Sequence, residues 1–300
     1  MDPEQSYQNH QTTYENTACN EKVVSRLKHF PECLTIDDWR ENRFLSCIDP
    51  ILENYPDASW LTVADGYFGT AARYILGKGS KALATDLDVK ALDIACQKEW
   101  IGLYEKANAE NLQYPDNTFD FAFCKEAFHH FPRPAIAFYE MCRVAKFGIV
   151  LSEPNDWIPA PFFRKLLSKI KGNLFALVGR RERPHSDEGC YEEPSRNYVY
   201  TVSKREITKM AIALDYPVII YRYLHDYWEP KYNDLSIHSG GMILLKLRIK
   251  FAGLLNLLRF NGLNRIQIII LKSSPSNKKL LVKFREAGFK VEFLPKNPYL

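Results

Sequence analysis

The sequence lacks the features that mark secreted chains and chains that cross a membrane. Residues 1–21 are polar and carry acids, where a signal peptide has a basic start and an apolar run. No window reaches the roughly 18 uncharged apolar residues of a membrane span. The nearest, residues 242–260, is interrupted by four lysines and arginines. The sequence therefore predicts neither a signal peptide nor a membrane span.

The seven cysteines lack the spacing of a disulfide framework or of a structural zinc site. They include no C-x-x-C pair, and their number is odd. Such a pattern is expected in a reducing compartment, so we predict a cytoplasmic location and no metal site. No internal repeat is evident either, which argues against a solenoid or propeller.

Charge is unevenly distributed along a chain of otherwise ordinary composition. Hydrophobic residues make up 46% and charged residues 25%, as expected for a folded globular protein. Residues 1–160 contain 15 Lys and Arg against 24 Asp and Glu, whereas residues 161–300 contain 25 against 12. The two net charges, −9 and +13, indicate either different partners for the two halves or acidic and basic parts that pack together. The sequence leaves the oligomeric state open.

A regular alternation of strand-like and helix-like segments begins at Trp60. Strands are predicted at 61–64, 81–85, 119–124 and 148–152, and helices at 70–76, 88–100 and 136–145. Alternation of this kind predicts an α/β fold with a Rossmann-like, mostly parallel sheet that is covered by helices on both faces. In such sheets ligands bind beyond the carboxyl ends of the strands.

The flanking regions follow no such alternation. Residues 1–20 are predicted as a flexible arm and 21–55 as two or three short helices. Further helices are predicted at 161–170, 203–214 and 277–287, and further strands at 218–223, 266–271 and 290–294. Ser203 and Glu206 have the spacing of a capping box. We therefore divide the chain into an N-terminal arm with helices (1–58), a cofactor-binding core (59–155) and an acceptor-binding or lid region that completes or extends the sheet (156–300).

Two features of the core point to a nucleotide cofactor. A turn at residues 64–69 contains two glycines, which let a backbone approach a ligand closely. Asp86 ends the second strand, where an acid accepts hydrogen bonds from the two hydroxyls of an adenosine ribose. Both NAD and S-adenosylmethionine carry that ribose. The alternative role, a cap for the next helix, fits Asp88 better than Asp86.

The following segments favour S-adenosylmethionine. Residues 108–123, 125–131, 140–144 and 152–154 carry an N-A-E-N-L-Q-Y-P-D-N-T-F-D run, a K-E-A-F-H-H-F turn, an E-M-C-R-V helix and an S-E-P strand end. Together they resemble the class I methyltransferases of the type 11 kind, over about 95 residues from Trp60 to Pro154. A dehydrogenase is disfavoured because the first turn lacks the G-x-G-x-x-G spacing.

The resemblance implies a set of residues that bind S-adenosyl-L-methionine. These residues are Ala64, Asp65, Gly66, Gly69, Asp86, Leu87, Asn108, Ala109 and Lys125. The first four would line the methionine part, the next four would hold the adenosine, and Lys125 would begin the loop under the sulfonium. The chain departs from the family pattern at Thr62, where an acid is usual, at Ala64, where a glycine is usual, and at Asn108, where an aspartate is usual. Asp65 is a candidate for the missing carboxylate.

A base is needed only if the methyl acceptor is a hydroxyl. His129, His130 and Glu153 follow strands of the sheet and are the candidates for catalysis, because histidine accepts protons near neutral pH and an acid orients it. The alternative is that the two histidines only pack the turn.

The acceptor is expected to bind residues of the second half. The segment 191–200 has the composition of a lid, and Arg180, Arg181 and Arg183 favour an anionic acceptor such as a nucleotide-linked sugar, a glycan precursor or a phospholipid-linked intermediate. Basic amphipathic stretches at 162–170 and 242–260 leave peripheral membrane contact open. The alternatives are an RNA or protein methyltransferase, and a catalytically inactive cofactor-binding or scaffold module. Nucleic acid is disfavoured because residues 125–128 lack the D/N-P-P-Y/F motif of base-modifying enzymes.

Overall fold

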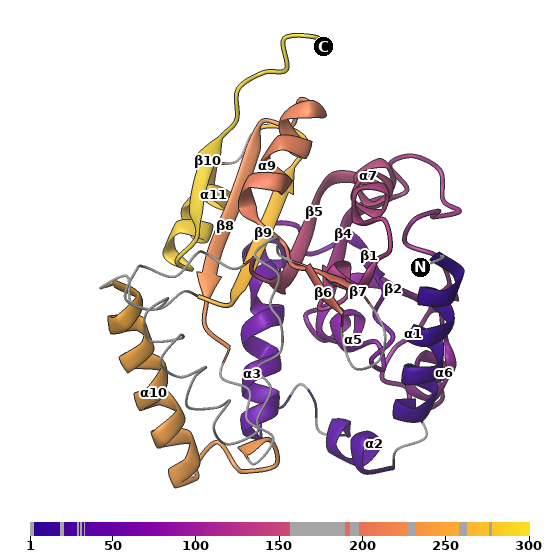
Figure 1. The fold of residues 1–300 in the computed structure, drawn as a ribbon, viewed down its shortest axis with the longest axis vertical. Coiled ribbons are helices and arrows are strands. Elements are labelled where there is room, and N and C mark those ends of the chain that lie inside the picture. The colour runs from indigo at the N-terminus through magenta and orange to yellow at the C-terminus, as the bar shows by residue number, and fades with distance from the viewer. Residues whose placement is uncertain are drawn as a thin grey trace, which may run out of the picture.

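The computed structural model describes residues 3–18, 21–28, 30, 32, 34–156, 190–192, 198–226, 232–257, 263–275 and 278–300. Across these residues an eight-stranded sheet forms the centre of the molecule, with strand order β10-β8-β9-β5-β4-β1-β2-β3 (Figure 1). The strands are β1 (Ser59–Val63), β2 (Lys81–Asp86), β3 (Tyr104–Lys106), β4 (Phe119–Lys125), β5 (Ala145–Pro154), β8 (Val218–Leu224), β9 (Arg265–Leu271) and β10 (Lys290–Phe293).

The sheet is mostly parallel. β1 pairs in parallel with β2 and β4, β2 with β3, and β4 with β5. β9 is antiparallel to both β5 and β8, so β8 has the direction of the parallel strands, while β10 is antiparallel to β8. The carboxyl ends of β1, β2, β4 and β5 therefore share one edge of the sheet with the start of β9, and the predicted α/β, Rossmann-like architecture is confirmed.

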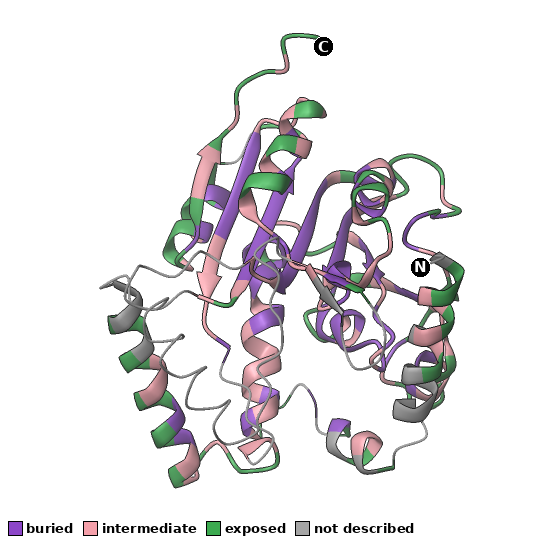
Figure 2. Cartoon of the chain, in the orientation of Figure 1, coloured by how far each residue is buried: buried purple, intermediate pink, exposed green. Residues whose placement is uncertain are grey.

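Helices bury both faces of the sheet. Along β1, Trp60 belongs to one apolar cluster and Leu61 to the other, as the period of two in a strand requires. The first cluster includes α4 (Asp49–Asn54), α5 (Thr70–Gly77), α6 (Lys90–Gln97) and α11 (Lys278–Glu286). The second includes α7 (Pro134–Val144) and α9 (Lys204–Ala213). The inner strands β1, β4, β5 and β9 are mostly buried, whereas β10 at the edge of the sheet is not (Figure 2).

The N-terminal region is more ordered than the sequence predicts. Residues expected to form a flexible arm are helix α1 (Pro3–Ala18), which lies against α6 (Figure 1). The prediction was wrong because the helix is polar and depends on contacts with distant residues, not on an apolar stripe of its own. The short helices expected after it are α2 (Glu21–Leu27), α3 (Ile36–Leu45), the 3-10 turn η1 (Ser46–Ile48) and α4.

The second half completes the same sheet. β8, β9 and β10 continue it beyond β5, and Ser203 caps α9 in the predicted capping box with Glu206. Three short strands were not predicted: β3, and the separate pair β6 (Cys190–Glu192) and β7 (Tyr198–Tyr200). The 242–260 segment contributes α10 (Gly240–Leu257). In the described part of the chain no helix is long and apolar enough to span a membrane. The expected helix at 161–170 lies outside the described residues.

Candidate functional site

The glycine turn after β1 keeps a left-handed backbone at a position without glycine. Ala64 has φ 55°, and Phe68 and Gly69 have φ 56° and 62°. Alanine rarely adopts this conformation, which costs roughly 1–2 kcal/mol, so the surrounding fold must impose it. The turn thus retains, with alanine, the kind of conformation that the usual glycine would adopt freely.

Asp65 holds the turn against α5. Its two carboxylate oxygens accept the backbone N–H groups of Ala71 and Ala72 at 3.1 and 2.8 Å. Burial raises the pKa of Asp65 to about 6, although these N–H groups act in the opposite direction. The carboxylate that the sequence offered for the cofactor therefore caps a helix, and it is absent from the pocket described below.

Asp86 lies at the carboxyl end of β2, under the glycine turn. It is 2% exposed and accepts the backbone N–H groups of Gly66 at 2.9 Å and Asp88 at 3.0 Å. Burial raises its pKa to about 7. Asp88, not Asp86, accepts the backbone N–H of Lys90 at the start of α6. Asp88 therefore fills the role at the start of the helix that was the alternative for Asp86. The carboxylate of Asp86 can still accept hydrogen bonds from a ligand.

A pocket opens beside Asp86 at this edge of the sheet. It brings together five of the predicted cofactor residues, Ala64, Asp86, Leu87, Asn108 and Ala109, and one predicted catalytic residue, His130. Gly66 does not line the pocket but lies directly against Asp86, which does. An added Cβ at Gly66 would stand 2.5 Å from Oδ2 of Asp86. Gly69 packs instead toward Ile101 and Leu92.

Sequence reasoning missed the outer wall of this pocket. Tyr7 of α1 lines it and donates a hydrogen bond to Oε2 of Glu110 at 2.9 Å. Glu110 also accepts the backbone N–H and Nε of Arg133 at 2.7 and 2.6 Å. Glu110 falls inside the N-A-E-N-L run and so carried a signal, whereas nothing near Tyr7 marks it as part of a site.

Lys125 belongs to a network of ion pairs, not to the pocket. We call this network the sheet-edge ion cluster, and it consists of Arg40, Glu41, Lys125, Glu126, Asp226 and Arg265. Lys125 Nζ lies 2.7 Å from Oε2 of Glu41 on α3. Burial lowers the pKa of Lys125, but Glu41 and Glu126 outweigh burial and raise it on balance. Both members of the Lys125–Glu41 pair are therefore ionised at neutral pH.

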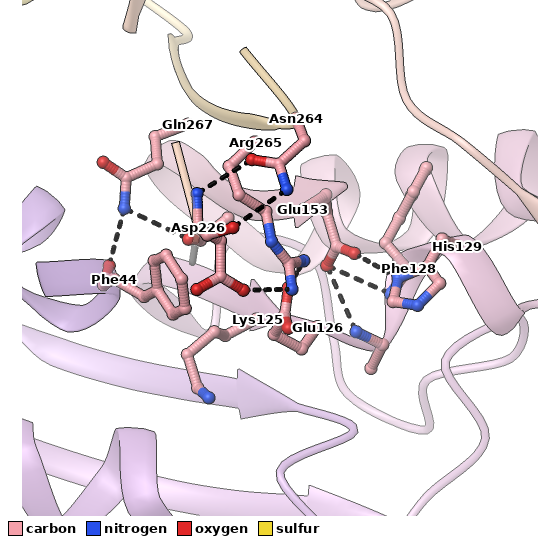
Figure 3. A network of polar contacts seen from close by, with 12 residues as sticks. Phe44, Lys125, Glu126, Phe128, His129, Glu153, Asp226, Asn264, Arg265 and Gln267 are labelled. Carbon is pink, nitrogen blue, oxygen red and sulfur yellow. Dashed lines mark hydrogen bonds and ion pairs between the residues drawn. The ribbon is translucent and has the colours of Figure 1, made fainter. Parts of the chain in front are cut away.

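The rest of the cluster joins three elements that are distant in sequence. Arg40 of α3 makes a bidentate contact with Asp226 at 2.6 and 2.8 Å. Arg265, the first residue of β9, pairs with Asp226 at 3.1 Å and with Glu126 (Figure 3). The cluster holds three basic and three acidic groups, so its charges balance. None of its members other than Lys125 was predicted.

The three predicted catalytic residues come together at the turn η2 (Phe128–His130). Glu153 is 1% exposed, and its Oε2 lies 2.6 Å from Nδ1 of His129 (Figure 3). Its other oxygen accepts the backbone N–H groups of Ala127 and Phe128 at 3.2 and 3.1 Å. The rings of His129 and His130 are 4.0 Å apart. Glu153 and His129 thus form a buried pair behind His130, which faces the pocket.

Two segments that were predicted to bind the acceptor lie wholly or partly outside the described residues. Arg180, Arg181 and Arg183 are outside the described residues, as is the middle of the 191–200 segment. The described parts of that segment are β6 and β7, and β7 lies against η2.

The sheet is mostly parallel, with β9 inserted antiparallel between β5 and β8, and is therefore Rossmann-like. Its pocket lies beyond β1 and β2, beside an acid on β2, which is where such folds bind nucleotide cofactors. Residues 61–151 match a family model described as a methyltransferase domain. This part of the chain belongs to the class I S-adenosylmethionine-dependent methyltransferases, so the protein is an enzyme and its cofactor is S-adenosylmethionine.

Several solved structures resemble the chain. A methyltransferase dependent on S-adenosylmethionine, from Methanosarcina mazei, is 17% identical with a TM-score of 0.47, over 75% of this chain and 98% of that one. Magnesium protoporphyrin IX methyltransferase from Synechocystis PCC 6803 is 14% identical, with a TM-score of 0.47 over 79% of this chain and 85% of that one. A Burkholderia thailandensis 1,6-didemethyltoxoflavin-N1-methyltransferase is 13% identical, with a TM-score of 0.48 over 87% of this chain and 89% of that one. None of the curated proteins matches. Likenesses this distant assign no acceptor.

Proposed function

We propose that the pocket beside Asp86 is the adenosine site of a methyltransferase that acts on a polar, anionic small molecule or a glycan or nucleotide-sugar type of acceptor. One observation supports the adenosine site: Asp86 and Leu87 at the end of β2, and Asn108 and Ala109 after β3, line a single pocket. Asp86 would accept hydrogen bonds from the ribose hydroxyls, and Leu87 would lie against the adenine.

The remaining cofactor contacts are proposed from the same geometry. The turn of Ala64 and Gly66 would carry the methionine part, because its backbone approaches Asp86 too closely for a side chain at Gly66. Asn108 uses its side-chain oxygen to accept the backbone N–H of Glu110 at 2.9 Å. That bond fixes the side chain at the pocket wall and leaves its amide N–H groups to contact the adenine edge.

We propose that the Glu153–His129 pair provides proton transfer. When bound, S-adenosylmethionine supplies the methyl group. The carboxylate of Glu153 would accept a hydrogen bond from Nδ1–H of His129, which leaves Nε2 as the atom that takes a proton from a hydroxyl acceptor. Glu153 is a positioning residue in this scheme, because both of its oxygens are engaged within the turn. His130 would line the passage between cofactor and acceptor.

The sheet-edge ion cluster supports a charged acceptor. It lies where β4 and β5 end, the edge at which ligands of such sheets bind. Glu126 has φ 58°, an unfavourable backbone conformation, and its side chain is 26% exposed. Arg265 keeps Asp226 as a second partner. An anionic group of the acceptor would therefore replace Glu126 beside Arg265, and the β6–β7 pair, which lies against η2, would cover it.

A cytoplasmic location remains part of this proposal. It is supported by Cys47, Cys96, Cys124 and Cys142, which are free thiols.

Calorimetry with S-adenosylmethionine tests the cofactor site. We expect Asp86→Ala to weaken binding more than about tenfold, because hydrogen bonds to a charged carboxylate contribute roughly 1.5–3 kcal/mol. Asp88→Ala is the matched control, since this neighbouring carboxylate binds Lys90 and should leave affinity nearly unchanged. Unchanged affinity in Asp86→Ala would place the ribose elsewhere. Absence of binding by the unmodified protein at millimolar cofactor would overturn the proposed function in favour of an inactive module.

Cofactor affinity should also depend on pH. Burial raises the pKa of Asp86 to about 7, so a growing fraction of this carboxyl is protonated as the pH falls below that value. The ionised form accepts both ribose hydroxyls, whereas the protonated form carries a competing O–H. Affinity should therefore fall as the pH falls, by up to about tenfold per pH unit below 7. Dissociation constants measured between about pH 5.5 and 7.5 should show this slope, and it should vanish in Asp86→Asn. A slope that survives in Asp86→Asn would assign it to another group, such as Asp65.

A further inference from the structure

Helix α10 has an apolar face that is exposed along its length. Ile243, Leu244, Leu247, Phe251 and Leu254 are between 44 and 63% exposed. Four of them recur at spacings of four, four and three residues, which places them in one stripe about 80° wide along the helix. Figure 2 shows this exposed side facing outward from the molecule. A contiguous exposed apolar stripe of this kind marks an interaction surface.

The opposite side of α10 fixes the helix to the protein. Met242 and Leu245 are 3 and 2% exposed and form a small apolar cluster with Ile36 of α3, against which Trp39 also packs. The helix is therefore apolar on two opposite sides. The inner side packs on α3, whereas the outer stripe stays exposed.

Charge distinguishes among the partners that such a stripe accepts. Lys246 and Lys250 are exposed and flank the stripe, and Arg248 lies at its other border. The helix Gly240–Leu257 contains no acidic residue. A second copy of the same face would bring like charges together, whereas anionic lipid headgroups are complementary to the basic flanks while the apolar stripe enters the acyl region. From this combination we infer that α10 docks the protein on the surface of an anionic lipid bilayer.

Helix α10 lies close to the sheet-edge ion cluster, where the acceptor is proposed to bind. A small pocket lies between α3 and α10. It is lined by Trp39, Tyr232 and Leu245 together with Arg40 and Asp226 of the sheet-edge ion cluster. The inference goes beyond the proposed function and stands independently of it, because it concerns a surface that does not touch the cofactor pocket.

Co-sedimentation of the full-length protein with vesicles tests this. We expect binding to phosphatidylcholine vesicles that contain about one third phosphatidylglycerol, weak binding to phosphatidylcholine alone, and loss of binding at high salt. Leu247→Asn/Phe251→Asn should weaken partitioning at least about tenfold, and Lys246→Glu/Lys250→Glu should do the same. Leu103→Asn, at another exposed apolar residue, and Lys278→Glu/Lys296→Glu, which changes net charge equally, are matched controls that should bind normally.

Three outcomes would overturn the inference. The first is no binding to anionic vesicles. The second is binding that both α10 variants leave unchanged. The third is a concentration-dependent dimer, seen by analytical ultracentrifugation without lipid binding, that the α10 variants abolish, since the occupant would then be a second copy. Cofactor affinity of each variant, measured by calorimetry, shows that it is folded and separates failure of lipid docking from failure of the proposed function.

Discussion

Replacing Gly66 with alanine is expected to weaken S-adenosylmethionine binding by about ten- to a hundredfold. The new Cβ would stand 2.5 Å from Oδ2 and 2.7 Å from Cγ of Asp86, which is closer than a carbon approaches either atom. Asp86 would have to leave the position in which the N–H groups of Gly66 and Asp88 hold it. Losing its hydrogen bonds to the ribose would cost roughly 1.5–3 kcal/mol, which corresponds to about ten- to a hundredfold in affinity.

Gly102→Ala is the control for this prediction, because a Cβ at Gly102 meets nothing within 4 Å. Calorimetry gives the affinities, and thermal denaturation shows whether the variants fold. Gly66 has no positive φ, so the substitution probes close approach and not backbone freedom. If Gly66→Ala bound the cofactor normally, the ribose contact would not depend on the observed position of Asp86.

Replacing Glu153 with glutamine is expected to lower kcat by about a hundredfold, the scale of a lost general base, with little change in cofactor affinity. Glu153 accepts hydrogen bonds on both sides, from Ala127 and Phe128 on one oxygen and from His129 on the other. A glutamine presents an amide N–H to one of these sides. This amide N–H would face another donor, either the backbone N–H groups of the turn or Nδ1–H of His129. The imidazole then loses the tautomer that leaves Nε2 without a proton.

Two measurements separate this role from simple packing. Nitrogen NMR of labelled histidine reports the tautomer of His129 directly, and we expect it to change in Glu153→Gln but not in Glu286→Gln, at an exposed carboxylate. His129→Ala should lose as much turnover as Glu153→Gln, and the double variant should be no slower, because the two residues act as a unit. Full turnover in both single variants with reduced thermal stability would return the pair to a packing role.

The core of the fold was predictable because its signals are local. The strand at 61–64 is recognisable as a short buried run followed by a turn and the helix at 70–76, and the two occur as β1 and α5. α1 was not predictable in the same way. Its polar sequence contains no apolar stripe, and its position depends on Tyr7 bonding to Glu110, which is 103 residues away.

The predicted cofactor residues also divide into those that local sequence identifies and those whose role depends on contacts with distant residues. Asp86 and Asn108 were identified from motif spacing, and the structure places them in one pocket. The sequence also offered Asp65 and Lys125 as ligands of the cofactor. Asp65 instead accepts the N–H groups that begin α5, and Lys125 pairs with Glu41, 84 residues earlier. A carboxylate or an ammonium group shows its chemistry in the sequence, but its partner is chosen by whatever the fold brings within about 3 Å.

The sequence by itself determined the alternating core, the class of enzyme, its cofactor and the acid on β2, because each depends on spacing within a short stretch. Only the tertiary structure decided that Glu153 holds His129, that α1 closes the pocket, and that Arg40, Asp226 and Arg265 gather at one edge of the sheet. These contacts join residues between 24 and 186 positions apart. No local pattern encodes such distances, since burial and charge pairing are fixed only when the sheet brings its strand ends together.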